Sequence, residues 1–189
     1  WRLHEPRDDV DRLARIRLDH AVRQALARGD FHLHYQPQVG LASGEVVGCE
    51  ALLRWRDPEL GDVPPGDFIP VAEESGFIVG LGDWVLGEAV RQAAAWRADG
   101  WVMPVAVNVS ALQFQRADFV ERVAQVLRAA GLPAVLLELE LTESILVHDA
   151  DAALERLRAL DALGVQLAID DFGTGYSSLG YLKRFPIRR

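Results

Sequence analysis

The chain has 189 residues, half of them apolar, and carries a formal net charge of −8. A chain of this length can bury one sizeable hydrophobic core, which favours a single globular unit. The acidic balance argues against a protein that coats a nucleic acid polymer, because such proteins usually present a basic face. No apolar run approaches the roughly 18 residues of a membrane span, and the single Cys49 cannot form an internal disulfide. We therefore expect a cytoplasmic domain.

Predicted helices and strands alternate along the chain. Helices are predicted where apolar residues recur every three or four positions, and most of them end at a glycine, the residue best suited to a left-handed helix cap. Strands are predicted from period-2 alternation or from short apolar runs. The predicted elements are, in chain order, a helix at 8–27, a strand at 31–35, a turn at 41–45, a strand at 46–52, helices at 68–75 and 83–98, a strand at 104–109, a helix at 118–130, a strand at 135–141, a helix at 152–163 and a strand at 166–169.

This alternation is typical of successive strand–helix units on a parallel sheet. The nearly continuous apolar strand at 104–109 fits a sheet that is covered on both faces. Two α/β architectures satisfy the pattern, an open doubly wound sheet and a (β/α)₈ barrel. No glycine-rich phosphate fingerprint follows the first strands, which weakens the case for a nucleotide-binding open sheet.

Polar residues interrupt or follow the apolar strands at four places. They are Glu50, Asn108, Glu138 with Glu140, and Asp170 with Asp171. In a barrel these positions lie at or near the C-terminal ends of the strands, where active sites of that fold are built. Burying an unpaired carboxylate costs several kcal/mol, so a convergent group of them needs a cation, and oxygen donors suit Mg²⁺ or Mn²⁺. The pattern predicts a metal-assisted barrel enzyme without naming its substrate.

Each of these acidic residues also has a structural interpretation when taken alone. Glu140 could face solvent on an edge strand, and residues 170–171 could begin a turn before Gly173. The coincidence at four strand ends favours the metal site. The five histidines show no zinc spacing. His32 and His34 share one strand face, and a structural role is favoured for that pair.

Several short motifs then become specific. They are YQP at 35–37, EALLRW at 50–55, PGDFIPVAEESG at 65–76, NVS at 108–110, ELTE at 140–143 and DDFGTGYSSL at 170–179. In this order and at this spacing they resemble the EAL family of cyclic di-GMP phosphodiesterases. The resemblance covers the chain from about residue 19 onward. A lone EAL tripeptide would have no diagnostic value, whereas the whole series does.

The resemblance implies a modified TIM barrel with an antiparallel first strand, of which about five strands lie in this chain. It also implies hydrolysis of cyclic di-GMP to linear pGpG with Mg²⁺ or Mn²⁺. By matching motifs, the first metal would be bound by Glu50, Asn108, Glu140 and Asp170. Asp170 would bridge to a second metal that Asp171 also binds. Such a pair can lower the pKa of a water and stabilise the charge of in-line attack, so Glu50, Asp170 and Asp171 are the expected catalytic residues.

The resemblance assigns further roles outside the metal site. Arg54 would hold a phosphate oxygen, which its planar fork suits better than a lysine would. Gln36 would contact a guanine, Leu53 would form an apolar wall, and Asp83 is a candidate for base contact. The loop at 171–178 would shape the metal site and contribute to homodimer contacts, with Glu143 as its anchor.

The resemblance also bears on domain organisation. Residues 1–27 resemble the linker helix that joins an upstream GGDEF or sensory domain to an EAL domain, and residues 28–189 resemble the N-terminal portion of the EAL domain. The family carries a Lys on the next strand and, on a later strand, a Glu that completes the second metal site and assists the nucleophilic water; neither is present here. We therefore expect the parent protein to continue beyond Arg189 and this stretch alone to be an inefficient enzyme. The alternative function is a catalytically inactive cyclic di-GMP receptor, against which the retained acidic ligands argue.

Overall fold

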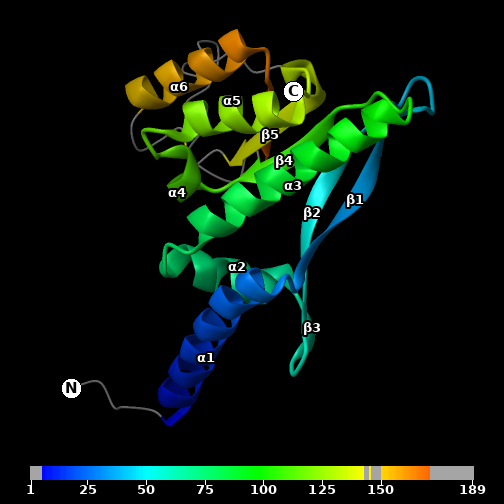
Figure 1. The fold of residues 1–189 in the computed structure, drawn as a ribbon. Coiled ribbons are helices and arrows are strands. Elements are labelled where there is room, and N and C mark those ends of the chain that lie inside the picture. Colours follow the sequence, from blue (N-terminus) through cyan, green and yellow to red (C-terminus); the bar gives the residue numbers. More distant parts are fainter. Residues whose placement is uncertain (1–5, 143–144, 146–149, 171–189) are drawn as a thin grey trace.

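The computed structural model describes residues 6–142, 145 and 150–170 (Figure 1). Its elements run in the order α1 (Pro6–Arg28), β1 (Phe31–Val39), β2 (Val46–Asp57), β3 (Gly61–Val63), α2 (Pro65–Glu74), α3 (Ile78–Ala98), β4 (Val105–Val109), α4 (Ala111–Phe114), α5 (Phe119–Ala130), the 3₁₀ helix η1 (Ala134–Leu136), β5 (Leu137–Thr142), α6 (Ala150–Leu163) and β6 (Gln166–Asp170). None of the helices in these described ranges combines the length and apolarity needed to cross a bilayer.

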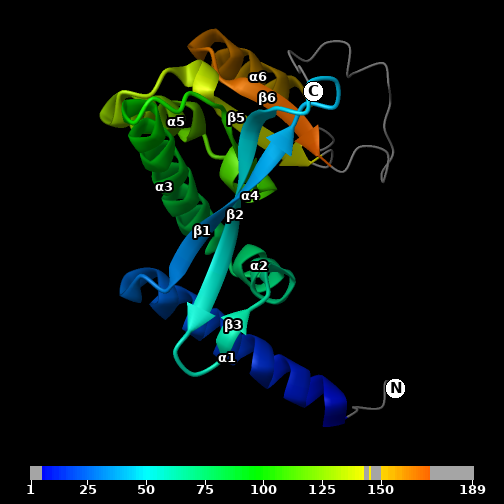
Figure 2. The ribbon, with the colours of Figure 1, turned by 90° about the vertical axis from the view of Figure 1, so that its right-hand side faces the viewer.

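One sheet organises the molecule. Its strand order is β1-β2-β4-β5-β6, and the short β3 pairs with β2 beside this path. β1 runs antiparallel to β2, whereas β2, β4, β5 and β6 are mutually parallel. The predicted α/β architecture, part of a TIM-like barrel with a reversed first strand, is confirmed. Figure 2 shows the curved sheet with α3, α5 and α6 on one side of it and α1 projecting from the opposite end of the molecule.

The predicted elements are present, with some changes at their ends. β1 and β2 continue to Val39 and Asp57, past the predicted ends at residues 35 and 52. Their long antiparallel ladder, which pairs Phe31 with Trp55 and Pro37 with Cys49, extends both strands beyond the apolar alternation. A proline is tolerated there because β1 is an edge strand of the described sheet.

Helix ends follow the predicted glycine signals. Gly131 adopts φ 63° after α5, and its backbone N–H bonds to the carbonyl of Arg128, as in a left-handed helix cap. α3, in contrast, begins at Ile78 and not at the predicted residue 83. The residue before it, Phe77, offers no side-chain cap, so the sequence carries no start signal at that point.

The main core lies between the sheet and helices α3, α5 and α6. Alternate residues of each strand point into it, for example Val107 on β4 and Leu139 on β5, both with at most 1% of their surface exposed. Leu86 on α3 and Leu157 on α6 meet them from the helix side. We call this side of the sheet the helix-covered face. Its members on the strands are Cys49, Ala51, Val105, Val107, Val109, Leu137, Leu139, Leu141 and Leu167.

A second apolar cluster joins α1 and α2 to the ends of β1 and β2. Phe31, Trp55 and Phe68 pack with ring centroids 5.4–5.7 Å apart. Val22 and Ala25 of α1 are fully buried in the same cluster. The C-terminal half of α1 is therefore packed into the domain, and the expected boundary between a linker at 1–27 and a domain at 28–189 stays a prediction.

Candidate functional site

The polar strand residues share the face opposite the helices. Because directly paired residues point to the same side of a sheet and alternate residues to opposite sides, the strand register settles this placement. Glu50 pairs with Gln36 on β1 and with Ala106 on β4. Asn108, two residues beyond Ala106, pairs with Glu140. We call this the open face, represented by Gln36, Glu50, Leu52, Arg54, Asn108 and Glu140.

The three donors on the open face are staggered across the sheet. Glu50 is level with Ala106, and Asn108 lies one step of two residues further along β4. Asn108 and Glu140 are level with one another, and the backbone of Asp170 is level with Thr142, again one step further. Strands tilted in a barrel produce this stagger. It brings residues that lie far apart in the sequence onto neighbouring strands.

One hydrogen bond links the first two members directly. The Asn108 Nδ2 amide donates to Glu50 Oε1 at 2.7 Å. Glu50 and Glu140 are half-buried, and Asn108 is exposed on its strand. An amide whose nitrogen donates to a carboxylate keeps its oxygen for another partner. Asn108 Oδ1 and a Glu50 oxygen are thus both available as ligands at the same place.

The chemistry of this donor set fits a hard divalent cation. Glu50, Asn108 and Glu140 offer carboxylate and amide oxygens, which Mg²⁺ and Mn²⁺ accept. Within the described residues, no three His, Cys, Asp or Glu side chains are gathered closely enough to hold a metal ion, so the donor set depends on the amide of Asn108 as well as on carboxylates. The side chain of Asp170 lies outside the described part of the chain, as do Asp171 and Glu143.

A second glutamate of β5 lies beneath this group. Glu138 is on the same face as Glu140, pairs with Ala106 and Gln166 at the level of Glu50, and is only 4% exposed. The sequence showed Glu138 as a polar strand residue but assigned only Glu140 to the metal. The two residues differ in burial: Glu140 lies nearer the strand end and is half-buried, whereas Glu138 is buried.

Two of the predicted substrate contacts share the open face. Gln36 pairs with Glu50, and Arg54 lies four positions beyond Glu50 on the same strand. The Arg54 guanidinium donates to the Leu53 carbonyl at 2.8 Å. It makes no ion pair with any of the acidic side chains that the structure describes. Arg54 as a residue is half-buried, and its guanidinium has donors left for an anion.

The other two predicted contacts lie elsewhere. Leu53 alternates onto the helix-covered side, where it packs against both apolar clusters. Asp83, on α3, accepts a hydrogen bond from Gln113 Nε2 at 3.3 Å and faces the Arg122 guanidinium at 3.8 Å. Asp83 thus contacts residues of α4 and α5 and makes no hydrogen bond or ion pair with Glu50.

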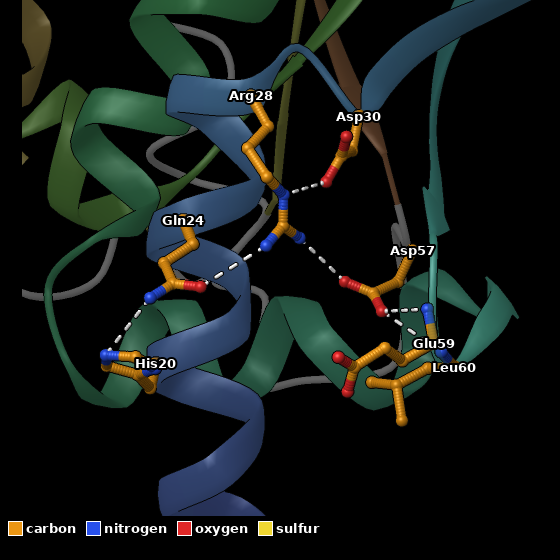
Figure 3. A network of polar contacts seen from close by, with 7 residues as sticks. All are labelled: His20, Gln24, Arg28, Asp30, Asp57, Glu59 and Leu60. Carbon is orange, nitrogen blue, oxygen red and sulfur yellow. Dashed lines mark hydrogen bonds and ion pairs between the residues drawn. The ribbon is translucent and has the colours of Figure 1, made fainter.

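A polar network fixes the far end of the strand that bears Glu50 and Arg54 (Figure 3). Arg28, the last residue of α1, donates to Asp30 at 2.7 Å and to Asp57 at 2.9 Å. The buried Asp57 also accepts from the backbone N–H groups of Glu59 and Leu60 at 2.9 and 3.0 Å. Burial acts most strongly on the Asp57 pKa and would raise it, but these two N–H groups and the Arg28 charge together hold it below its usual range.

Two other titratable groups near Glu50 are not suited to proton transfer at neutral pH. Burial raises the pKa of the Cys49 thiol to about 11. Burial, reinforced by the charge of Glu88, raises the pKa of Tyr35 to about 12. Both lie on the helix-covered side, with Tyr35 packed edge-on against Trp96.

The sequence predicts a shared strand face for His32 and His34 and favours a structural role, but it does not place them beside the candidate site. His32 and His34 pair with Arg54 and Leu52, so both lie on the open face beside the candidate site. Their alternation with Leu33 and Tyr35 was a sufficient signal for a shared face. The pairing of β1 with β2, which places this face beside Glu50, depends on tertiary structure and has no local sequence signal.

A partial barrel with oxygen donors at successive strands defines the class of protein. The EAL domain model matches residues 19–189, and the chain belongs to that family. It is 51% identical over 172 residues to MucR of Pseudomonas aeruginosa, a bifunctional diguanylate cyclase/cyclic di-GMP phosphodiesterase, with 90% of this chain and 25% of that protein covered. It is 46% identical over 170 residues to the cyclic di-GMP phosphodiesterase PdeR of Escherichia coli K12, with 90% and 26% covered.

A solved structure agrees with these relatives. The structure of PaMucR phosphodiesterase in complex with c-di-GMP superposes with a TM-score of 0.88 at 50% sequence identity, covering 92% of this chain and 70% of that one. This chain spans about a quarter of the length of the two curated relatives.

Proposed function

We propose that the protein containing this chain hydrolyses cyclic di-GMP to linear pGpG with the help of divalent metal ions. The observation that supports this most directly is the pairing of Asn108 with Glu50 at 2.7 Å on the open face, with Glu140 in register with Asn108. The choice of cyclic di-GMP as the substrate rests on the similarity of this chain to cyclic di-GMP phosphodiesterases, MucR and PdeR among them.

The first metal, Mg²⁺ or Mn²⁺, is held in this proposal by Glu50, Asn108, Glu140 and Asp170. A second is held by Asp170 and Asp171. Bound divalent cations lower the pKa of a water and stabilise charge on the phosphoryl oxygens. The chain's own contribution is orientation: the Asn108 amide fixes one Glu50 oxygen, and the tilt of the sheet sets the spacing of the ligands on β2, β4 and β5.

Arg54 binds a phosphate oxygen in this proposal. A guanidinium that no described carboxylate neutralises can give both arms of its fork to a phosphate. Gln36, opposite Glu50, contacts a guanine. Leu53 and Asp83 remain predicted contacts whose present neighbours are the apolar clusters and Arg122, respectively.

The wider organisation is proposed on the family resemblance. It comprises a linker helix at 1–27, an upstream GGDEF or sensory domain, and a homodimer formed through the EAL domain. Glu143 anchors the loop that contributes to the dimer contacts. Glu143→Ala is expected to weaken metal binding, which isothermal titration with Mn²⁺ measures.

The function is tested by incubating the full-length protein with cyclic di-GMP and Mn²⁺ and measuring pGpG by chromatography. Glu50→Ala should reduce turnover by more than about 100-fold. Replacing a residue that only hydrogen-bonds to a metal ligand already lowers metal affinity or activity by about 10–100-fold, and Glu50 is itself a proposed ligand. Glu45→Ala is the matched control: it removes an exposed glutamate in the turn that precedes the same strand. Tight binding of cyclic di-GMP by the wild type without product would identify a receptor in place of an enzyme.

A further inference from the structure

The two histidines of β1 lie beside the proposed substrate site. His32 pairs with Arg54 and His34 with Leu52, so their side chains share the face of Glu50 and Arg54. Their ring centroids are 5.0 Å apart, so the rings form one continuous strip along the strand. The residues between and beyond them, Leu33 and Tyr35, pack on the other side against the main core.

Their surroundings do not suit a structural role. Both residues are exposed. Neither imidazole has a hydrogen bond or an ion pair with any residue that the structure describes, whereas the exposed His20 on α1 contacts Gln24 Nε2 at 3.4 Å. A metal site is also disfavoured, because within the described ranges no third His, Cys, Asp or Glu joins the pair.

The nitrogen groups of this strip complement an anion. His32 and His34 contribute ring N–H donors, and Arg54 stands opposite His32 with donors to spare. On the same face, Glu50 precedes Arg54 on β2 by four residues, and Asn108 of the neighbouring β4 bonds to Glu50 there. The open face thus has an oxygen-rich part at Glu50, Asn108 and Glu140, and a nitrogen-rich part at Arg54 and the two histidines.

The substrate has a group for each part. A cyclic dinucleotide contains two phosphodiesters, and the proposed reaction cuts only one of them, which must lie at the metal ligands. The other needs a binding site of its own. Glu50 and Arg54 are four residues apart on one strand, about 14 Å at roughly 3.4 Å per residue, so the open face is long enough for two phosphates.

We propose that His32 and His34, together with Arg54, bind the phosphodiester of the substrate that is not cleaved. The inference rests on the proposed function and deepens it by adding two substrate-binding residues on β1. The histidines hold the phosphate by N–H donation, so they contribute to substrate affinity and take no part in the chemical step.

Two double variants separate phosphate binding from base stacking. His32→Phe/His34→Phe keeps flat rings but removes the N–H donors, and His32→Gln/His34→Gln keeps donors but removes the rings. The dissociation constant for cyclic di-GMP is measured by isothermal titration in the full-length protein with Mg²⁺, in a Glu50→Gln background that suppresses turnover. The Phe variant should bind about tenfold more weakly, as expected for losing one or two charge-assisted hydrogen bonds. The Gln variant should stay within about threefold of the parent.

A kinetic measurement complements the titration. With Glu50 intact, the Phe variant should raise KM and leave kcat nearly unchanged, because the contact is made equally in the ground state and the transition state. His20→Phe, a change to an exposed histidine on α1, is the control and should alter neither value. If the Phe double variant fails to fold by circular dichroism, His32→Ala/His34→Ala carries the same expectation.

The outcomes are decisive. Unchanged affinity in the Phe variant, or a Gln variant that binds more weakly than the Phe variant, overturns the inference, the latter in favour of base stacking. If the wild type binds and cleaves cyclic di-GMP while the variants match it, only the inference fails. If the wild type does not bind cyclic di-GMP at all, the proposed function fails as well.

Discussion

The two faces of the sheet are built from the same strands and differ in almost every other respect. Along β4, Val107 is 1% exposed beneath the helices, while its neighbour Asn108 is exposed on the other side. Along β5, Leu139 is fully buried and Glu140 is half-buried. Period-2 alternation thus divides each strand into a half that holds the fold together and a half that is available to a ligand. Stability and function should therefore respond to different residues, even to adjacent ones.

The largest effect on stability should come from the helix-covered face. Leu139→Ala removes a fully buried side chain and should lower the free energy of unfolding by about 2–5 kcal/mol. Glu50→Gln, on the open face, should change it by less than about 1 kcal/mol, because the new amide oxygen still accepts from Asn108. Urea unfolding followed by tryptophan fluorescence measures both. A Glu50→Gln change as costly as Leu139→Ala would show that the faces are not separable.

Adjacent residues of β4 give the sharper version of this comparison. Asn108→Ala should lower the affinity for Mn²⁺ by about 10–100-fold while leaving the unfolding midpoint nearly unchanged. Val107→Ala should do the reverse, costing about 2 kcal/mol of stability through lost burial and sparing metal affinity. Isothermal titration and thermal unfolding of the two variants decide the matter. An equal loss of Mn²⁺ affinity in both variants would show that the affinity depends on the rigidity of the site and not on the ligand that Asn108 provides.

Asp57 is a polar exception at the end of the helix-covered side and tests the comparison differently. Its folded-state pKa is held below the unfolded value, so its contribution to stability is present above about pH 4 and is lost as the pH falls through the folded pKa. Asp57→Asn cannot titrate. The stability difference between wild type and variant should therefore shrink as the pH is lowered from 7 to 2. A difference independent of pH would mean that the backbone hydrogen bonds, which Asn can still accept, dominate.

The smallest effect concerns Cys49, next to Glu50 but on the covered side. It is 4% exposed, and burial raises the pKa of its thiol to about 11. At pH 8 the native protein should leave Cys49 unmodified by iodoacetamide, whereas urea-unfolded protein should be labelled there, as read by peptide mass spectrometry. Rapid labelling of the native state would show that β2 opens to solvent at Cys49, and the helix-covered face would then not be protected there as the comparison requires.

Much of the fold could be predicted because its signals are local. Glycines after helices, such as Gly131, and apolar runs such as the one around Val107 identify elements without knowledge of their neighbours. β3 was missed because three residues are too few for a period, and it exists only where the prolonged β2 offers a partner. α4 was missed although Ser110 accepts from the Gln113 backbone N–H at 3.2 Å, a capping arrangement that its serine could have indicated.

The site was predicted less evenly. Glu50, Asn108 and Glu140 could be grouped because each interrupts an apolar strand, and the structure brings Glu50 and Asn108 into contact. Leu53 could have been placed on the covered side by counting alternation from Glu50. The contacts of Asp83 could not have been predicted, because its partners Gln113 and Arg122 lie on separate helices. The histidines required the register of β1 against β2, which no local pattern encodes.

The reversed direction of β1 determines where the chain enters the barrel. Because β1 runs opposite to β2, its first residue, Phe31, stands beside Trp55 near the end where β2 finishes. α1 is joined to Phe31 through Gly29 and Asp30, so it lies at the end of the barrel where the parallel strands finish. There the Arg28 guanidinium donates a hydrogen bond to Asp57. A parallel first strand would have brought the same helix to the floor. Because β1 is inverted, the helix that enters the domain directly contacts β2, the strand that bears Glu50 and Arg54, so a displacement of α1 would act on that strand.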